Sequence, residues 1–377
     1  MIERTKLKQE ITNLLSEKNI VWLSGVRRVG KTTLCKSLVE DGGKYLDCEL
    51  PSIRAQIEDP EFFWKQQGDN LVVLDEVHRL PDPSNVLKIA ADHFPKVKVV
   101  ATGSSTLSAR RKFKDTLTDR KRTLWMQPLL ASEIKNESGY NLERRLLRGG
   151  LPPAYLSPDI NDTFYSEWLD AFWAKDVQEL FAIDKKTNFL KLAEMILRQS
   201  GEMFEASSFA GPCEISRQTV TNYLEILSIT LFAIVVRPFS NKRANDIVSA
   251  PKVYGFDTGF VCFTRGWFQL RPEDMGGLIE HLVLSELIAN VGKENIYYWR
   301  DKQGHEIDFV IKPSRGREVH TVECKLNHKN FDTRNLRAFR NAYPHGKNFL
   351  YAANVDEPTP LKIGDKEVLA LPLGSWV

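Results

Sequence analysis

A phosphate-binding loop motif constrains the fold of this chain more than any other feature of its sequence. Residues 25–33 read Gly-Val-Arg-Arg-Val-Gly-Lys-Thr-Thr, which matches the pattern G-x-x-x-x-G-K-[ST] at every fixed position. The apolar run 20–23 before the motif predicts a buried strand, and apolar residues after it predict one side of a helix. In such a unit the backbone N–H groups of the loop and the N-terminus of the helix face an anion. The motif therefore predicts a strand–loop–helix unit that holds phosphate.

The residues of this loop are predicted to hold ATP together with Mg²⁺. Gly30 lets the backbone approach phosphate closely, Lys31 is expected to reach the outer phosphates, and Thr32 is expected to ligate Mg²⁺. The predicted nucleotide-binding residues are Gly25, Val26, Arg27, Arg28, Val29, Gly30, Lys31, Thr32 and Thr33.

A pair of acids follows a second apolar stretch. Residues 70–76 read Asn-Leu-Val-Val-Leu-Asp-Glu, which predicts a buried parallel strand whose carboxylates emerge at its C-terminal end. In P-loop enzymes this position holds the Mg²⁺ shell and the residue that polarises the attacking water. We assign Asp75 to the metal and Glu76 to the water, as a catalytic residue. A pair of acids after a strand also occurs in plain loops.

Further strands are predicted at residues 44–48, 97–102 and 122–126, and a helix at 83–94. This alternation predicts an α/β domain with a parallel sheet, flanked by helices, that holds the nucleotide at the C-terminal ends of its strands. Thr102 lies at one such end, where it can sense the γ-phosphate, orient water or cap the following turn.

Basic residues are concentrated between the last two strands of this region. The segment 110–122 contains Arg110, Arg111, Lys112, Lys114, Arg120, Lys121 and Arg122. Three interpretations stay open for it: a solvated face, an arm that contacts phosphate, or an arginine finger that acts in trans.

Composition limits the classes of protein that fit. The 377 residues carry a net charge of +3, which is too small to indicate a nucleic-acid partner by itself. The five cysteines are scattered and lack C-x-x-C spacing, which favours a reducing compartment over a disulfide framework or structural zinc. The N-terminal residues 1–18 resemble an amphipathic helix and no signal peptide, and the longest apolar run, 229–236, is too short to span a bilayer. These features predict a cytoplasmic protein with no membrane partner.

The turn at residues 149–153, Gly-Gly-Leu-Pro-Pro, predicts a domain boundary. We expect three domains: residues 1–150 with the P-loop and the parallel sheet, residues 151–250, which are mainly helical, and residues 251–377.

The middle region contains a helix with a clear apolar stripe. Ser216 is a good N-cap, and the residues that form the stripe are Val220, Tyr223, Leu224 and Leu227. With a short helix before it, a β-segment at 230–237 and a polar tip at 240–243, it resembles a winged helix-turn-helix. Its exposed face is then expected to enter the major groove of DNA. Alternatively, the module is a spacer or a docking piece.

Acidic residues in the C-terminal region suggest a second site. A very apolar helix at 278–288 carries Glu280, and strands are predicted at 296–300, 306–311 and 319–325. A carboxylate in an apolar strand must be paired or hold a cation. We therefore predict a Mg²⁺ site with Asp308 and Glu323 as ligands and Glu280 as a further ligand. Lys325 would orient the metal-bound water or stabilise developing charge, so Asp308, Glu323 and Lys325 are predicted catalytic residues.

The order helix, three strands, helix, strand, with Asp308 followed by Glu323-Cys-Lys325, resembles the PD-(D/E)xK nuclease core. A salt bridge in a nuclease-derived fold that has lost catalysis is the alternative.

The whole chain resembles a large prokaryotic group of AAA-type ATPases that end in a domain of unknown function with restriction-endonuclease-like topology. The matching stretches are residues 25–33, 74–77, 102–105, 149–152, 306–309 and 323–325. The resemblance implies ATP binding and favours hydrolysis. Lys175-Asp176 departs from the Arg-Asp that is usual in the group, and a lysine cannot grip a phosphate with two parallel hydrogen bonds.

Two classes of function remain open. One is an ATP-driven enzyme in which the ATPase, the winged helix and the nuclease-like domain act together on DNA. The other is a nucleotide-switched regulatory or scaffold protein whose C-terminal domain binds a partner and cuts nothing. The sequence leaves a homo-oligomer open in both.

Overall fold

The computed structural model describes residues 2–40, 42–103, 113, 116–135, 139–159, 162–178, 181, 183, 185–240, 250–313, 318–364 and 366–376. The chain forms two compact units. Unit 1 comprises Met1–Gln127, Asp170–Ile183 and Ile229–Leu231, and unit 2 comprises Pro128–Leu169, Asp184–Ser228 and Phe232–Val377. None of the described helices combines the length and the apolar character that crossing a membrane requires.

Unit 1 is built on a parallel sheet of five strands in the order β2-β3-β4-β1-β5. The strands are β1 (Ile20–Ser24), β2 (Lys44–Asp47), β3 (Leu71–Asp75), β4 (Lys98–Thr102) and β5 (Lys121–Trp125). All five residues of β1 are buried, as expected for a parallel strand that is covered on both faces. The parallel sheet predicted from the sequence is thereby confirmed.

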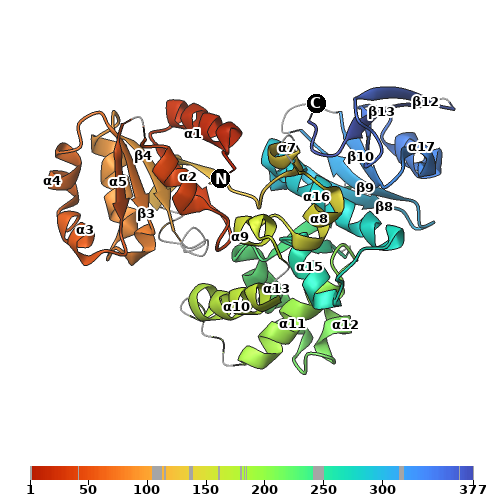
Figure 1. Cartoon of the computed structure of the whole chain (residues 1–377), viewed down its shortest axis with the longest axis horizontal. Coiled ribbons are helices and arrows are strands. Elements are labelled where there is room, and N and C mark those ends of the chain that lie inside the picture. Colours follow the sequence, from red (N-terminus) through yellow and green to blue (C-terminus); the bar gives the residue numbers. More distant parts are fainter. Residues whose placement is uncertain are drawn as a thin grey trace. The chain divides into compact units, whose positions relative to one another are not determined.

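Helices cover both faces of this sheet (Figure 1). The helical segments of unit 1 are α1 (Thr5–Glu17), α2 (Lys31–Ser37), α3 (Pro51–Gln56), α4 (Pro60–Lys65), the 3₁₀ turn η1 (Val77–Arg79), α5 (Pro83–His93) and the π-helical turn η3 (Trp173–Val177). On the α5 side, Trp22, Val72 and Val99 from three strands join one buried cluster with Leu87. On the other side lie α1 and α2 (Figure 1).

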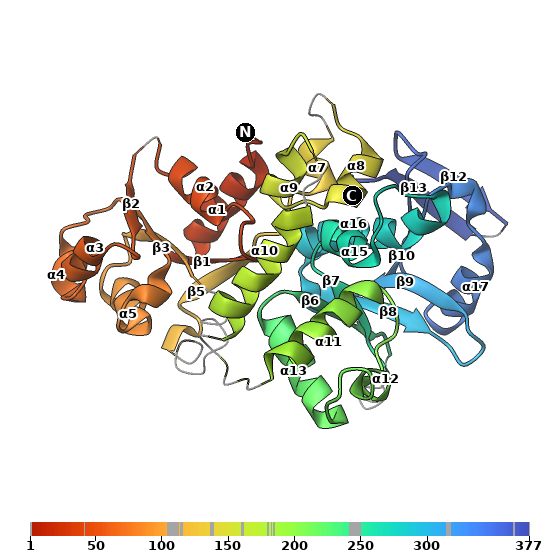
Figure 2. The same ribbon diagram turned by 60° about the horizontal axis from the view of Figure 1, so that its bottom comes forward.

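Unit 2 combines many helices with a second sheet. Its helical segments are α7 (Ala131–Ile134), α8 (Leu142–Arg148), α9 (Pro152–Leu156), α10 (Asp162–Phe172, which ends in unit 1), α11 (Lys186–Arg198), α12 (Ala206–Ala210), α13 (Arg217–Ile229), α15 (Thr258–Arg265), α16 (Pro272–Val291), η4 (Lys293–Asn295), η5 (His328–Asn330) and α17 (Thr333–Ala342). Figure 2 shows α16 and α17 on opposite sides of the strands β8 (Ile296–Arg300), β9 (Glu306–Ile311) and β10 (His320–Lys325).

The sheet of unit 2 has eight strands in the order β12-β13-β11-β10-β9-β8-β6-β7 and mixes parallel with antiparallel pairs. The strands are β6 (Ala233–Pro238), β7 (Lys252–Gly255), β8 (Ile296–Arg300), β9 (Glu306–Ile311), β10 (His320–Lys325), β11 (Asn348–Ala352), β12 (Thr359–Ile363) and β13 (Lys366–Pro372). The predicted C-terminal order of helix, three strands, helix and strand is present as α16, β8, β9, β10, α17 and β11. The restriction-endonuclease-like character of this region stays a prediction.

The structure places the predicted boundary turn at 149–153 and the predicted β-segment at 230–237 within unit 2 or its sheet. The turn at 149–153 lies inside unit 2, where the Gly150 N–H donates to Asp257 Oδ2 at 2.6 Å. The predicted β-segment at 230–237 is β6, which pairs with β7 and also with β8, so the hairpin is continuous with the C-terminal strands. The bounds of the two compact units differ from those of the predicted domains. The three domains 1–150, 151–250 and 251–377 remain a prediction.

Some predicted features lie outside the described residues. They are Ser104 and Ser105 after β4, Arg110, Arg111, Lys112 and Lys114 of the basic segment, and residues 241–243 of the predicted polar tip.

Candidate functional site

The predicted phosphate loop joins β1 to α2 in unit 1. Gly30 has φ 101° and Arg28 has φ 61°, so the loop makes two left-handed turns before the helix begins. A Cβ on Gly25 would lie 2.8 Å from the carbonyl oxygen of Met126, so only glycine fits there. Lys31 Nζ donates to the carbonyl oxygens of Gly25 at 2.9 Å and Val26 at 3.2 Å. The structure therefore brings the predicted lysine back over its own loop.

Asp75, at the C-terminal end of β3, is buried, and its carboxylate accepts hydrogen bonds from three hydroxyl groups. Thr32 Oγ1 donates to Asp75 Oδ2 at 2.7 Å, and the Tyr45 hydroxyl donates to the same oxygen at 2.6 Å. Thr102 Oγ1, at the end of β4, donates to Asp75 Oδ1. The two predicted metal ligands of unit 1, Thr32 and Asp75, thus lie in direct contact. Tyr45 lies on β2 and was not predicted, because nothing in its local sequence marks it.

Glu76 adopts a left-handed conformation with φ 55°. Its N–H donates to Thr102 Oγ1 at 3.1 Å, and its Oε2 lies 3.1 Å from His78 Nδ1. Burial raises the pKa of Glu76, but the His78 hydrogen bond and the charge of Lys31 outweigh burial and lower it overall. Glu76 is therefore ionised beside the loop. Burial lowers the pKa of Lys31, and the charge of Glu76 opposes that effect.

A third carboxylate at this loop comes from far along the sequence. Asp176 lies in η3, and its Oδ2 accepts a hydrogen bond from Arg27 Nε at 2.9 Å. Burial raises the pKa of Asp176, while the charge of Arg27 opposes the shift. The neighbouring Lys175 is exposed, so the acid rather than the lysine of this pair faces the loop. We call residues 25–33 together with Asp75, Glu76 and Asp176 the P-loop site.

Unit 2 brings together three of the predicted C-terminal residues. Asp308 on β9 and Glu323 on the neighbouring antiparallel strand β10 are both buried. Lys325 Nζ lies 3.0 Å from Glu323 Oε2 and 3.6 Å from Asp308 Oδ2, and the Cys324 N–H donates to Asp308 Oδ2 at 2.8 Å. Glu323 Oε1 is buried, and none of the residues that the structure describes forms a hydrogen bond with it. A buried carboxylate oxygen without a partner is costly, which marks this position as one that suits a cation.

Glu280 on α16 is engaged by two residues of β7. The Tyr254 hydroxyl donates to Glu280 Oε2 at 3.1 Å, and Lys252 Nζ lies 3.9 Å from the same oxygen. Lys252 also forms an ion pair with Glu306. Lys252, at the start of the buried strand β7, was not among the predicted site residues. We call the six side chains Lys252, Glu280, Glu306, Asp308, Glu323 and Lys325 the carboxylate–lysine cluster.

The pKa values of Glu280 and Glu323 in this cluster are raised, which favours the neutral form of both acids. Burial, followed by the charge of Asp308, raises the pKa of Glu323 to about 8 and that of Glu280 to about 7. Burial lowers the pKa of Lys325, but the charges of Asp308 and Glu323 raise it well above its ordinary value overall. Across the described ranges, no three His, Cys, Asp or Glu side chains are grouped so that they alone would hold a metal ion. The predicted role of Glu280 as a metal ligand therefore gains no support from this grouping.

The helix α13 has the amphipathic character that was predicted. Its buried residues are Val220, Tyr223, Leu224 and Leu227. The predicted outward residues Arg217, Gln218, Thr221 and Glu225 are all exposed. The Ser216 hydroxyl accepts the Thr219 N–H at 3.1 Å, which confirms the predicted N-cap.

The two arginines of the basic segment that the structure describes, Arg120 and Arg122, have acidic partners. Arg120 donates to Asp92 through Nε at 2.7 Å and through Nη2 at 3.2 Å. Arg122 Nε donates to Glu17 Oε2 at 2.8 Å. Both arginines are therefore held on the surface of unit 1 by ion pairs, in agreement with the solvated-face interpretation for this part of the segment.

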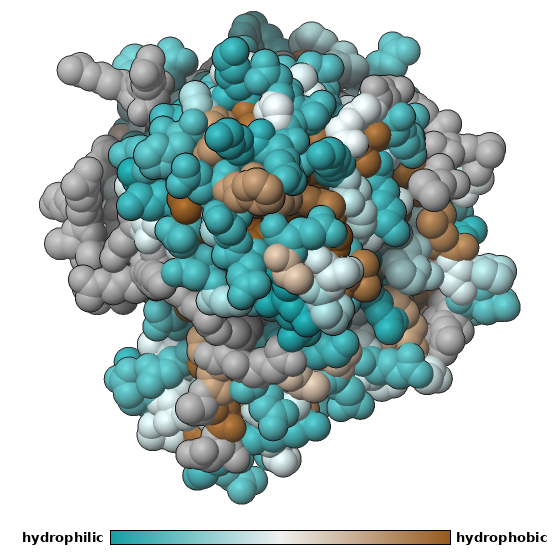
Figure 3. All heavy atoms as spheres, turned by 90° about the vertical axis from the view of Figure 1, so that its left-hand side faces the viewer, coloured by the Kyte–Doolittle hydropathy of each residue, from teal (hydrophilic) through white to brown (hydrophobic). Residues whose placement is uncertain are grey.

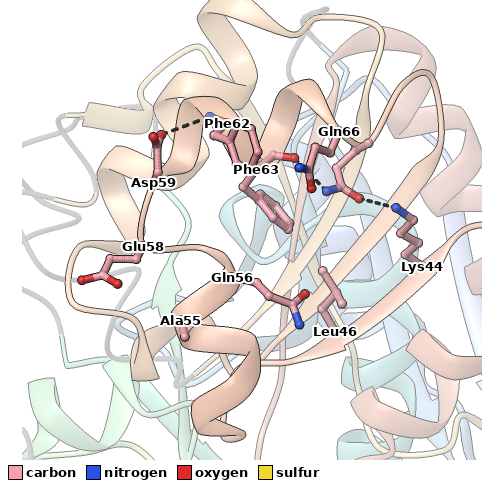
Figure 4. Close-up of a pocket in the computed structure, with 10 residues that line it drawn as sticks. Lys44, Leu46, Ala55, Gln56, Glu58, Asp59, Phe62, Phe63 and Gln66 are labelled. Atoms are coloured by element: carbon pink, nitrogen blue, oxygen red, sulfur yellow. Dashed lines mark hydrogen bonds between the residues drawn. The ribbon is translucent and has the colours of Figure 1, made fainter.

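Unit 1 also has an open cleft beside its edge strand β2 (Figure 4). Its volume is about 570 Å³, and its lining includes Leu46, Phe63 and the hydrogen-bonded pair Lys44 and Gln67. Figure 3 views this side of unit 1 and shows a largely hydrophilic surface with separate hydrophobic areas. None of the residues that line the cleft belongs to the P-loop site.

Three known families match successive parts of the chain. Residues 17–135 match an AAA domain, residues 139–271 match a domain of unknown function (DUF8612), and residues 275–374 match a second domain of unknown function (DUF4143). With the geometry of the loop, the first match identifies the fold of unit 1 as that of an AAA-type P-loop ATPase. The third match carries no assignment as a nuclease.

Proteins and solved structures with similarity over most of the chain are also known. Uncharacterized protein Rv2008c of Mycobacterium tuberculosis and Uncharacterized protein Mb2031c of Mycobacterium bovis are each 24% identical over 324 residues, which is 83% of this chain and 72% of each relative. The structure of the Walker-type ATPase PABY2304 of Pyrococcus abyssi is similar with a TM-score of 0.48 at 14% identity, over 70% of this chain and 96% of that chain.

Proposed function

We propose that this chain binds ATP with Mg²⁺ at the P-loop site and hydrolyses it. The observation that carries the proposal is the contact of Thr32 Oγ1 with Asp75 Oδ2 at 2.7 Å, directly beside the loop. A hydroxyl and a carboxylate that converge in this way are the hard oxygen ligands that Mg²⁺ prefers. Thr32 and Asp75 would hold the ion, which when bound neutralises charge that develops on the transferred phosphoryl group.

Within this proposal Glu76 acts as the group that orients and polarises water. The carboxylate is ionised because its pKa is lowered, so it can accept a proton. Thr102 fixes the backbone of Glu76 through the N–H and the carboxylate of Asp75 through a second hydrogen bond. This ties the two acids to one hydroxyl group. Lys31 would leave the carbonyl oxygens of Gly25 and Val26 and bind the outer phosphates.

Calorimetric titration of ATP tests this function. Wild type should bind ATP in the presence of Mg²⁺, and Lys31→Ala should lose at least about a hundredfold in affinity, because the lysine supplies the principal positive charge at the loop. Lys36→Ala, which removes a lysine from the last turn of α2, is the matched control and should bind like wild type. Equal ATP affinity in wild type and Lys31→Ala would contradict the proposal.

We propose further that the carboxylate–lysine cluster binds a divalent cation and acts on DNA. The observation that favours this is the buried Oε1 of Glu323, which lies beside Asp308 and has no hydrogen-bond partner among the described parts of the chain. Asp308 and Glu323 would hold the ion, with main-chain oxygens or water completing the shell, and Lys325 would face the phosphodiester. The exposed face of α13 would contribute contacts to DNA. In the alternative, the same fold binds a partner under control of the nucleotide and cuts nothing.

A cleavage assay separates these alternatives. Single- and double-stranded DNA should be incubated with Mg²⁺ or Mn²⁺, with and without ATP, and compared with Lys325→Ala. Cleavage by wild type and loss of cleavage in Lys325→Ala would support the enzyme. DNA or protein binding without cleavage in any condition would support the regulatory alternative.

A further inference from the structure

The ion pair between Arg27 and Asp176 joins two distant segments of unit 1. Arg27 lies within the phosphate loop, and Asp176 lies 149 residues further along the chain. The exposed fractions of the two side chains are 26% and 16%, so the pair is largely shielded from solvent. An ion pair in this setting is stronger than one on an open surface, because water screens it less.

The segment that carries Asp176 has an unusual backbone. The turn η3 is π-helical: the Gln178 N–H donates to the carbonyl oxygen of Trp173, five residues earlier, at 2.8 Å. Such turns are rare in proteins, and many of those that occur lie at functional sites. Trp173 and Val177 are buried on either side of Asp176, so the turn is anchored in unit 1 while its carboxylate faces Arg27.

The turn η3 belongs to a short segment of unit 1 that lies, in the sequence, between two segments of unit 2. Residues 170–183 belong to unit 1, but the residues on both sides of them belong to unit 2. The helix α10 begins in unit 2 and runs directly into η3. A displacement of Asp176 would therefore act on a helix whose first two turns are part of the other unit.

Asp176 is also electrostatically coupled to the rest of the P-loop site. The charges of Lys31 and Glu76 both act on its carboxylate, as does that of Arg27. The loop carries three basic side chains, Arg27, Arg28 and Lys31, and Arg27 is already paired with a protein carboxylate. A bound triphosphate would bring several negative charges to the same loop and would repel Asp176 while attracting Arg27.

We propose that Asp176 and the phosphates of a bound nucleotide compete for the Arg27 guanidinium, so that the turn 173–177 changes its packing with nucleotide occupancy. This inference rests on the proposed function of the P-loop site. Asp176 is a positioning residue in it: the carboxylate weakens nucleotide binding and in return makes η3 respond to the nucleotide.

The test compares Asp176→Asn with wild type in ATP titrations and in hydrogen exchange of the amides of η3. Asp176→Asn should bind ATP about tenfold more tightly, because removal of one charged competitor frees Arg27. In wild type, ATP should accelerate exchange in 173–177, and in Asp176→Asn this response should be absent. Glu167→Gln removes an exposed carboxylate from the same helix α10 and should behave like wild type in both measurements.

Arg27→Gln supplies an independent arm that does not alter η3 itself. It should abolish the response of η3 to ATP, and the double variant with Asp176→Asn should gain no affinity over Arg27→Gln alone. Unchanged or weaker ATP binding in Asp176→Asn, at an unchanged melting temperature, would overturn the inference. Loss of ATP binding in Lys31→Ala alongside that result would leave the proposed function standing, so the two failures can be told apart.

Discussion

The P-loop site and the carboxylate–lysine cluster use the same kinds of side chain, but their charges are balanced in different ways. At the P-loop site, the buried Asp75 carboxylate accepts hydroxyl groups from Thr32, Tyr45 and Thr102. In the cluster, Glu323 shares Lys325 with Asp308, and no residue within the described ranges pairs with its second, buried oxygen. The first site is satisfied by its own residues, and the second is not.

The pKa shifts express the same difference. Glu76 is surrounded by enough positive charge and hydrogen bonding that its pKa is lowered despite burial. Burial and the charge of Asp308 instead raise the pKa of Glu323 to about 8. A site whose acids are already compensated can turn its cations toward a polyanion, whereas a site with uncompensated acids is suited to a cation. The predictions below test whether this contrast holds.

The largest effect is expected from Glu76, because its ionised state is what distinguishes the P-loop site. Glu76→Gln should keep ATP affinity within about threefold of wild type and lower the turnover rate by 10² to 10⁴, roughly the usual contribution of a general base. Phosphate release measured at saturating ATP and Mg²⁺ checks this. Glu61→Gln, an exposed acid in the first turn of α4, is the matched control. If Glu76→Gln turns over ATP like wild type, the water is oriented by another group.

The next effect concerns the unsatisfied acids of the cluster. Mg²⁺ or Mn²⁺ added without nucleotide should slow hydrogen exchange in β9 and β10, because a ligand that binds only the folded state stabilises it by mass action. At a cation concentration of a hundred times Kd, the slowing should be roughly a hundredfold, which corresponds to about 2.7 kcal/mol. Asp308→Ala should remove the response, and the exposed Asp356→Ala should retain it.

The opposite result would be equally informative. If neither cation changes the exchange rates, and Asp308→Ala is as stable as wild type, the acids are ordinary buried polar groups. The contrast between the two sites would then be one of packing only, and the regulatory alternative would be preferred.

A smaller effect is expected from a histidine that burial keeps neutral in unit 2. Burial, followed by the charges of Arg265 and Arg145, lowers the pKa of His281 to about 3 from the ordinary value of 6.5. The unfolded chain binds a proton below pH 6.5 and the folded unit does not. His281 therefore contributes full stability above about pH 6.5, and stability is lost as the pH falls toward 3.

At pH 5 the loss from this group should be about 2 kcal/mol. Hydrogen exchange of the α16 amides at pH 5 and pH 7.5, corrected for the intrinsic rates, measures it. His281→Gln should flatten this dependence, and the exposed His345→Gln should leave it unchanged. Equal slopes in wild type and His281→Gln would mean that other groups dominate the pH dependence of unit 2.

The two sites also differ in how far the sequence could predict them. Most of the P-loop site is one contiguous motif followed by an acid pair at the end of a strand, so its residues could be named and its parallel sheet expected. Asp308, Glu323 and Lys325 could be found because strand periodicity places the last two on one face. Asp176 could not, since it reaches Arg27 from 149 residues away. Lys252 was missed for the same reason: pairing of β6 with β8 brings its hairpin into the C-terminal sheet, and no local pattern encodes that pairing.

The smallest effect is expected from the basic segment, and it sharpens the comparison by asking which unit would carry DNA. Arg120 and Arg122 are already paired with Asp92 and Glu17, so the double variant Arg120→Gln, Arg122→Gln should change DNA affinity by less than about twofold. The dependence of log affinity on log salt concentration should keep its slope, because no phosphate contact is removed. Arg217→Gln, on the exposed face of α13, should instead reduce that slope by about 1.

A reduction of about 2 in the double variant, one for each arginine, would identify this part of unit 1 as the arm that contacts phosphate. The carboxylate–lysine cluster of unit 2 would then have to act on DNA that is bound by unit 1. The two sites could then no longer be treated as serving separate ligands.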